Sequence, residues 1–215
     1  MKRAIFGLAI LTILWCSAAQ ADVSFDLKNN PQPDEENILL NSGITGFTVY
    51  GETNQSHILV AFSSTQILSE PSPGQARIVA QDGLINNIMI SVQGGFFFKD
   101  LIINPQCPAG SGGCGNAIVT VVANEEGGDT STFIFGNGDQ DDYYPLGNGE
   151  NRLTIYADGG ETIASVTIDS ETGFDNLKQP RISGVGAVPE PATMFLLGSG
   201  LIGLAGYGRK KFHKK

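Results

Sequence analysis

Short runs rich in valine, isoleucine, phenylalanine and threonine recur between turn signals throughout the middle of the chain. Several of them alternate apolar and polar residues, as Leu153 and Ile155 do, and this period of two is typical of strands buried on one face. Their spacing of about 10–15 residues is typical of an antiparallel sandwich or barrel. The 28 glycines, together with the breakers at residues 71–74 and 147–149, argue against long helices. The pattern therefore predicts an all-β fold.

We expect strands over residues 23–27, 46–50, 57–62, 76–80, 88–92, 96–103, 117–123, 130–135, 152–156, 162–168 and 181–183. Ile163 is out of phase with Val166 and Ile168, which predicts a bulge or irregularity between them. The three consecutive phenylalanines at 96–98 cannot all face one side of a strand. Two of them should enter the core and one should point outward, unless a bulge intervenes.

The middle of the chain is acidic, whereas both ends are basic. Residues 22–188 carry 6 Lys and Arg against 21 Asp and Glu, a net charge of −15. Like charges repel, so this part should bind neither nucleic acid nor an anionic membrane surface. Its length suits one core, and we expect a single antiparallel β-sandwich domain over residues 22–186.

The amino-terminal segment has the order of a secretory signal peptide. Two basic residues precede an apolar run over residues 4–15, and small residues follow, with Ala19 and Ala21 at positions −3 and −1 of a cut. We expect a signal helix over residues 1–21 that is removed after Ala21. Two alternatives stay open: a retained anchor, and lipidation at Cys16, although the residue before it is bulky.

Three features follow one another at the carboxyl end: a box of Pro189, Glu190 and Pro191, an uncharged apolar segment over residues 192–208, and a basic stop of Arg209, Lys210 and Lys211. An apolar segment of about 17 residues is just long enough for a transmembrane helix. The basic residues after it should stay in the cytoplasm by the positive-inside rule.

Residues 187–215 as a set resemble the PEP-CTERM sorting signal, which has these three parts in this order. The resemblance implies a bacterial protein exported through the inner membrane and held there briefly by its carboxy-terminal helix. It also implies an exosortase, an integral-membrane cysteine transpeptidase, as a partner, and a final place at the cell surface or in the extracellular matrix. Such proteins are commonly associated with extracellular polysaccharide and biofilm. The alternative is an ordinary carboxy-terminal anchor.

Two stretches of the middle part, "GETIASVTI" and "GFDNLKQPRI", are similar to segments of exported domains that often carry this signal. Those domains have the forms G-E-x-I-x-S-V-x-I and G-F-D-x-L-K-Q-x-R-I. The resemblance implies a jelly-roll-like sandwich similar to galactose-binding modules, and it implies no ligand. Pro180 departs from the pattern and predicts an edge strand, because proline cannot donate to a ladder.

Cys107 and Cys114 are the cysteines that remain after signal cleavage, and a glycine-rich loop separates them. We expect a disulfide, because exported proteins fold in an oxidising setting. Zinc is the competing interpretation, but it needs four ligands and the middle part holds one histidine, His57. We interpret His57 as a surface or edge residue.

Asp139, Asp141 and Asp142 are the candidate metal ligands, because alternating carboxylates can point at one calcium ion. The glycine and glutamate of an EF-hand loop are absent, and a solvated acidic turn is the competing interpretation. The adjacent Tyr143 and Tyr144 could anchor the loop or form a platform for a sugar ring. We therefore expect no cofactor other than calcium.

Signs of catalysis are weak. The sequence has neither a G-x-S-x-G nucleophile elbow nor a P-loop, and its acidic residues are too many for a catalytic pair to be chosen. We therefore expect a non-catalytic surface or matrix protein whose partner is extracellular polysaccharide. The alternatives are a secreted carbohydrate-active hydrolase and a calcium-dependent adhesin.

Overall fold

The computed structural model describes residues 22–40, 43–71, 76–125, 128–138 and 142–187, and throughout them the elements are strands. In chain order they are β1 (Asp22–Asp26), β2 (Glu36–Leu40), β3 (Gly46–Thr53), β4 (Leu59–Ser69), β5 (Arg77–Ala80), β6 (Ile85–Val92), β7 (Phe96–Phe97), β8 (Asp100–Ile103), β9 (Pro105–Gln106), β10 (Gly113–Asn124), β11 (Thr130–Phe135), β12 (Tyr144–Gly147), β13 (Leu153–Asp158), β14 (Thr162–Phe174), β15 (Asn176–Lys178), β16 (Arg181–Ser183) and β17 (Gly186–Ala187). The expected all-β class is confirmed.

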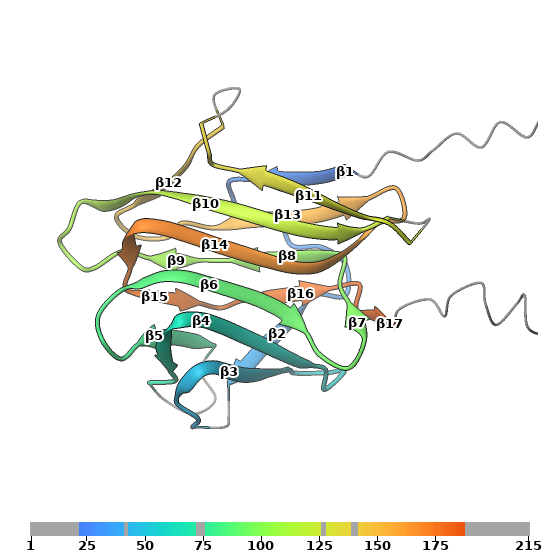
Figure 1. Cartoon of the computed structure of the whole chain (residues 1–215), viewed down its shortest axis with the longest axis horizontal. Helices are drawn as coiled ribbons and strands as arrows, with labels where there is room; N and C mark the ends of the chain where they lie inside the picture. Colours follow the sequence, from blue (N-terminus) through green and yellow to red (C-terminus); the bar gives the residue numbers. More distant parts are fainter. Residues whose placement is uncertain (1–21, 41–42, 72–75, 126–127, 139–141, 188–215) are drawn as a thin grey trace, which may run out of the picture.

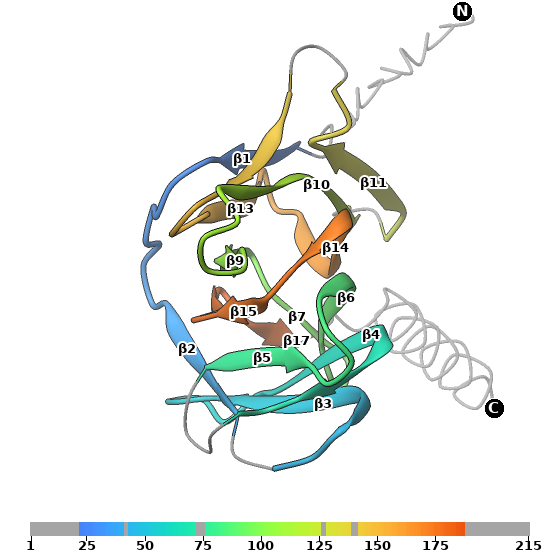
Figure 2. The same cartoon turned by 90° about the vertical axis from the view of Figure 1, so that its left-hand side faces the viewer.

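Most of the described strands form one antiparallel sheet, and its main path has the order β1-β13-β8-β16-β2-β3-β4-β6-β14-β10-β11. This sheet bends back on itself and is nearly closed (Figures 1 and 2). We call β3, β4, β6, β14, β10 and β11 the front layer, and β1, β13, β8 and β16 the back layer. Strand β2 joins the layers, because its first residues pair with β16 and Ile38–Leu40 pair with β3.

Shorter strands complete both layers. Strands β9 and β15 adjoin β8 and β16 along the chain and extend the back layer. Strand β15 pairs with β9 and with β5, and β5 pairs with β4, so the back layer meets the front layer at a second place. Strand β12 pairs with the first half of β10, whereas β11 pairs with its second half. A separate two-stranded sheet of β7 and β17 places Ala187, the last residue that the structure describes, beside Phe96.

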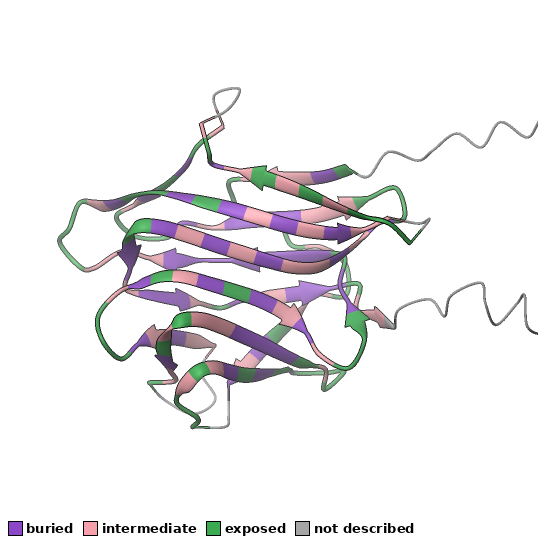
Figure 3. Cartoon of the chain, viewed as in Figure 1, coloured by how far each residue is buried: buried purple, intermediate pink, exposed green. Residues whose placement is uncertain are grey.

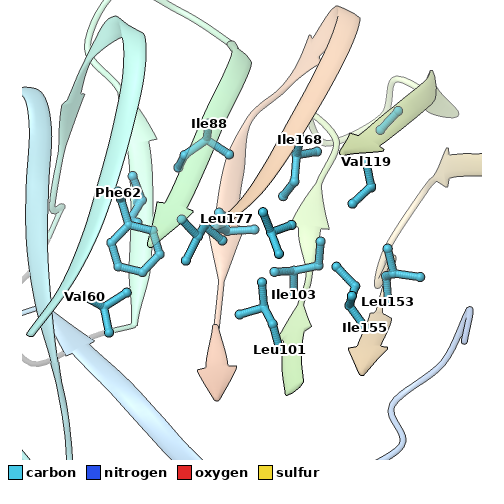
Figure 4. Packing of buried hydrophobic residues seen from close by; sticks show 14 of the residues in the cluster. Val60, Phe62, Ile88, Leu101, Ile103, Val119, Leu153, Ile155, Ile168 and Leu177 are labelled. Carbon is cyan, nitrogen blue, oxygen red and sulfur yellow. The ribbon is translucent and has the colours of Figure 1, made fainter. Parts of the chain in front are cut away.

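The hydrophobic core lies between the two layers, which present alternate side chains to it (Figures 3 and 4). Val119 and Ile168 come from the front layer, and Leu101 and Ile155 come from the back layer; all four are completely buried. Burial of one such side chain stabilises the fold by about 1.5–3 kcal/mol, so the alternating pattern of the strands is the main source of stability.

The structure confirms the irregularity predicted beside Ile163 and the predicted arrangement of the three phenylalanines. The pairing of β10 with β14 shifts between Val122, which faces Ser165, and Ala123, which faces Ile163, so Ala164 is the extra residue. The shift turns Ile163 into the core with Val166 and Ile168. In the phenylalanine run, Phe96 is 37% exposed, whereas Phe97 and Phe98 are buried.

The prediction of an edge strand after Pro180 is wrong. Strand β16 lies between β8 and β2 and pairs with both. Pro180 precedes the strand and is buried, and its carbonyl oxygen accepts a hydrogen bond from the Ile38 amide at 3.1 Å. Because its missing N–H lies outside the ladder, the proline interrupts no pairing of β16.

The "GFDNLKQPRI" stretch has a structural role at the turn from β14 into β15 and β16. Gly173 adopts φ +73°, and a Cβ there would lie 2.7 Å from the Leu84 Cβ. Phe174 and Leu177 are completely buried in the core. The Arg181 Nε lies 2.9 Å from the Glu35 Oε1, which ties β16 to the segment before β2.

The expected signal peptide with Ala19 and Ala21, the Pro189–Pro191 box, the 192–208 helix and the basic stop lie outside the described residues. Within the described ranges, no helix is long and apolar enough to cross a membrane.

Candidate functional site

The disulfide that the sequence predicts is present. Cys107 and Cys114 are bonded, with their Cα atoms 5.6 Å apart, and they join the end of β9 to the start of β10. The Cys107 sulfur lies 3.3 Å from the carbonyl oxygen of Leu146 on β12. The disulfide loop therefore packs against the strand that covers the first half of β10.

Asp142, at the end of the acidic loop, stabilises a turn through its carboxylate and its carbonyl oxygen. The Asp142 Oδ2 accepts a hydrogen bond from the Gly136 amide at 3.1 Å, and its carbonyl oxygen accepts one from the Gly138 amide, also at 3.1 Å. Asp139 and Asp141 lie outside the described residues. Within the parts of the chain that are described, no group of three or more His, Cys, Asp or Glu residues could hold a metal ion.

The two tyrosines after this loop differ in environment. Tyr144 is completely buried beside Phe135, and its hydroxyl donates to the Asn151 carbonyl oxygen at 2.5 Å. Burial raises the pKa of Tyr144 well above its ordinary value, so the hydroxyl stays a neutral donor. Tyr143 is 49% exposed, and its ring lies beside Gly138. Tyr144 is thus an anchor of the fold, and Tyr143 alone is available at the surface.

His57 lies on the surface at the turn before β4. Its side chain is largely exposed, and its Nδ1 lies 2.5 Å from the Glu52 Oε1. The turn between β3 and β4 is remote in the sheet from the disulfide, which joins β9 to β10, and from the acidic loop after β11. The position agrees with the interpretation as a surface histidine.

A polar depression of about 470 Å³ lies on the outer face of the front layer, at the end of β6, β14 and β10 near the disulfide. In Figure 1 this is the left-hand end of the three strands. The side chains that line it and matter for its chemistry are those of Asn86, Asn116, Ile118, Asp169, Glu171 and Thr172. Sequence reasoning missed these residues, because they come from three strands that are far apart in the chain.

Two breaks in strand pairing create the depression. The pairing of β10 with β12 shifts between Gly113 and Asn116, and the pairing of β14 with β6 is interrupted between Asp169 and Phe174. Such irregularities bend a strand and reorient its side chains. Because both fall at the same end of the front layer, the sheet is hollowed there instead of flat.

Hydrogen bonds hold the walls of the depression. The Thr172 hydroxyl donates to the carbonyl oxygen of Cys114, which links β14 to the disulfide. The Asn86 Nδ2 donates to the carbonyl oxygens of Ser170 and Glu171 at 3.0 and 3.1 Å. The side chains of Asn86 and Thr172 therefore stabilise the walls of the depression.

The remaining polar groups face solvent. The Asp169 Oδ1 accepts a hydrogen bond from Asn87 at 2.5 Å, which leaves its Oδ2 for a ligand. Within the described chain, the side chains of Asn116 and Glu171 have no hydrogen-bond partner, and both are exposed. Ile118, 40% exposed, supplies an apolar surface beside them. The site thus offers two carboxylates and an amide next to an aliphatic patch, and no cation.

A second, smaller pocket of about 330 Å³ lies in the back layer beside Asp100. The Asp100 Oδ2 accepts a hydrogen bond from the Ser183 hydroxyl, and the residue is 3% exposed. Burial, with a smaller contribution from the Glu35 charge, raises the pKa of Asp100 to about 6, although the Ser183 hydrogen bond opposes the shift. This carboxyl is a buried structural group that titrates near neutrality.

Residues 187–210 match the model of the PEP-CTERM protein-sorting motif. No curated protein and no solved structure matches the chain. The molecule is therefore an all-β domain that a PEP-CTERM sorting motif follows. The motif implies export, transient membrane anchoring and sorting by an exosortase, the membrane enzyme that processes such chains.

Proposed function

We propose that the β domain is a non-catalytic binding domain of a cell-surface or matrix protein, and that its ligand is a neutral exopolysaccharide. The ligand would bind in the depression between β6, β14 and β10. The observation that carries this proposal is the convergence of Asn116, Asp169 and Glu171 around Ile118 at the place where two strand pairings break.

The chemistry of the lining supports a sugar. Carboxylate and amide oxygens accept hydrogen bonds from sugar hydroxyls, and an aliphatic side chain can pack on the C–H face of a pyranose ring. Two carboxylates without a neighbouring cation would repel an acidic glycan. The net charge of −15 over residues 22–188 adds to that repulsion, so a neutral chain suits the site better.

The test is binding of the exported, purified protein to an array of neutral and acidic polysaccharides. Asn116→Ala combined with Glu171→Gln should weaken binding to the neutral ligand about thirtyfold. Asn116→Ala removes a hydrogen bond worth about 1 kcal/mol, and Glu171→Gln replaces a charged acceptor with a weaker neutral one at a similar cost. Asp158→Asn is the matched control, since it removes a charge from an exposed residue at the end of β13 in the back layer. Equal weakening by the control would contradict the proposed site.

The same experiment distinguishes a binding domain from a hydrolase and from a calcium-dependent adhesin. Release of reducing ends from the bound polysaccharide would assign a hydrolase instead of a binding domain. A loss of binding on adding chelator would assign a calcium-dependent adhesin. Failure of the protein to bind any polysaccharide would overturn the proposal.

A further inference from the structure

Strand β11 is an end of the sheet, and its unpaired edge lacks the features that usually prevent strand pairing. Within the described chain it pairs with β10 alone. An edge strand presents a row of unpaired N–H and C=O groups, and natural edges are commonly protected by charge, proline or a bulge. The six residues of β11, Thr-Ser-Thr-Phe-Ile-Phe, include no charge and no proline, and their pairing with β10 is regular.

The opposite end of the sheet is different. Strand β1 has the sequence Asp-Val-Ser-Phe-Asp, so a carboxylate stands at each end of its five residues. The Lys28 Nζ lies 3.2 Å from the Asp26 Oδ2 and adds a further charge to this edge. One end of the sheet is therefore protected by charge, whereas the other is left uncharged and rich in residues that favour strands.

The surface beside β11 is also uncharged. The outward side chains of the front layer form two rows that cross the sheet from β11 to β3: Thr132, Val122, Ser165, Ser91, Ala61 and Tyr50, and Ile134, Thr120, Thr167, Met89, Ser63 and Thr48. All twelve are neutral, although the part of the chain that contains them has a net charge of −15. An approaching molecule that is itself anionic would meet least repulsion here.

We propose that β11 is a self-pairing edge, through which two copies of the protein join their front layers into one antiparallel sheet. This inference goes beyond the proposed function and does not depend on sugar binding. The alternation of faces limits the register, because residues that oppose each other in a sheet must share a face. The two-fold axis of the pair must therefore pass through a residue and not between two residues. The two centres that pair most of the six residues of β11 are Thr132 and Phe133.

Repulsion between acidic residues favours antiparallel over parallel pairing of the two β11 strands. The nearest acidic residue, Asp129, precedes β11. In the register centred on Thr132 the two Asp129 residues would be about 20 Å apart, well beyond the screening length of about 8 Å at physiological salt. Parallel pairing would instead place them side by side. Antiparallel pairing of a strand with its own copy is also two-fold symmetric, so the contact closes as a dimer.

The test is the mass of the full chain in mild detergent, measured by light scattering during size-exclusion chromatography. The wild type should have twice the protein mass of the Ile134→Lys variant, because a lysine on an edge strand opposes pairing. Met89→Lys is the matched control: Met89 is an exposed apolar residue of the same face, but it lies on β6 in the interior of the sheet. The control should keep the mass of the pair.

Three results would overturn the proposal. The first is a wild type with the mass of one chain, and the second is a pair that survives Ile134→Lys and so forms through the tail. The third is equal dissociation of the pair by Met89→Lys, which would indicate that the two copies stack face to face.

Cross-linking gives a second measurement. Under mild oxidation, Thr132→Cys chains should link in the first register, and a mixture of Thr132→Cys and Ile134→Cys chains in the second. Thr120→Cys, on the neighbouring strand, should not link. Absence of a link in both registers would also overturn the inference.

Discussion

The ring of Phe25 on β1 stacks on the ring of Phe135 on β11, with centroids 4.8 Å apart and planes 9° from parallel. The two strands are the opposite ends of the sheet, so this stack joins them through side chains where no ladder between them is described. Tyr144 continues the contact, with its ring centroid 6.5 Å from that of Phe135. The nearly closed sheet is thus completed by aromatic packing.

Removing the ring of Phe25 should weaken the contact between β1 and β11. Phe25→Ala is expected to lower the free energy of unfolding by about 2–3 kcal/mol, because Phe25 is partly buried and a fully buried Phe→Ala costs about 3–5 kcal/mol. In urea unfolding, a double-mutant cycle of Phe25→Leu with Phe135→Leu should give a coupling of about 0.5–1.5 kcal/mol. Strict additivity of the two changes would show that the stack contributes nothing of its own.

The disulfide should stabilise the domain modestly. Its seven-residue separation closes a short loop, for which chain entropy gives about 2–3 kcal/mol. We expect Cys107→Ser with Cys114→Ser to lower the free energy of unfolding by this amount and also to weaken ligand binding, because Cys114 holds the Thr172 wall of the depression. Reductant should destabilise the wild type similarly and leave the double variant unchanged. A response of the double variant to reductant would exclude this explanation.

Asp100 should make stability depend on pH. Because the native state raises its pKa from 3.8 to about 6, the native state binds the proton more tightly than the unfolded state does. The stabilisation from this group is fully present below pH 3.8 and is lost as pH rises through about 6. The change is about 2–3 kcal/mol, at about 1.4 kcal/mol for each pKa unit.

Asp100→Asn removes this titration but keeps an acceptor for the Ser183 hydroxyl. Urea unfolding at a series of pH values should show that the variant is more stable than the wild type at pH 7 and that the difference disappears near pH 4. A variant that is less stable than the wild type at neutral pH would contradict the assignment of Asp100 as a destabilising charge.

Gly173 should tolerate no side chain. Gly173→Ala combines a left-handed φ with a Cβ only 2.7 Å from the Leu84 Cβ, and we expect a loss well above the cost of about 1–2 kcal/mol that the backbone strain alone carries. Gly43→Ala is the matched control, because Gly43 has φ +59° with nothing within 4 Å of an added Cβ. Equal thermal shifts for the two variants would show that the contact with Leu84 is unimportant.

The sorting box should be required for release from the membrane. Replacing Pro189, Glu190 and Pro191 with alanine leaves the apolar segment and the basic stop intact, so the chain should still be exported but keep its tail. Cell fractionation with an antibody against the β domain should find the variant in the membrane and the wild type outside it. The same distribution of both proteins would show that the box is not recognised.

Local pattern was sufficient to predict those strands whose side chains alternate, and it placed the shift beside Ile163 and the two buried phenylalanines. It missed β2, which follows a polar acidic run, and β12, where Pro145 and Gly147 resemble a turn. It also missed β9, β15 and β17, which are only two or three residues long. The prediction from Pro180 failed because a strand's position in a sheet depends on partners that are remote in sequence. The depression was unpredictable for the same reason: two separate pairings must break at one place.

Export, disulfide formation and trimming by an exosortase at the sorting motif each change the mass of this chain. The most direct measurement is the intact mass of the native protein from each cell fraction. We expect a species outside the cytoplasm that has lost residues 1–21 and the apolar, basic tail, and that carries one disulfide. A full-length chain in the cytoplasm, with both termini present and its cysteines reduced, would contradict it.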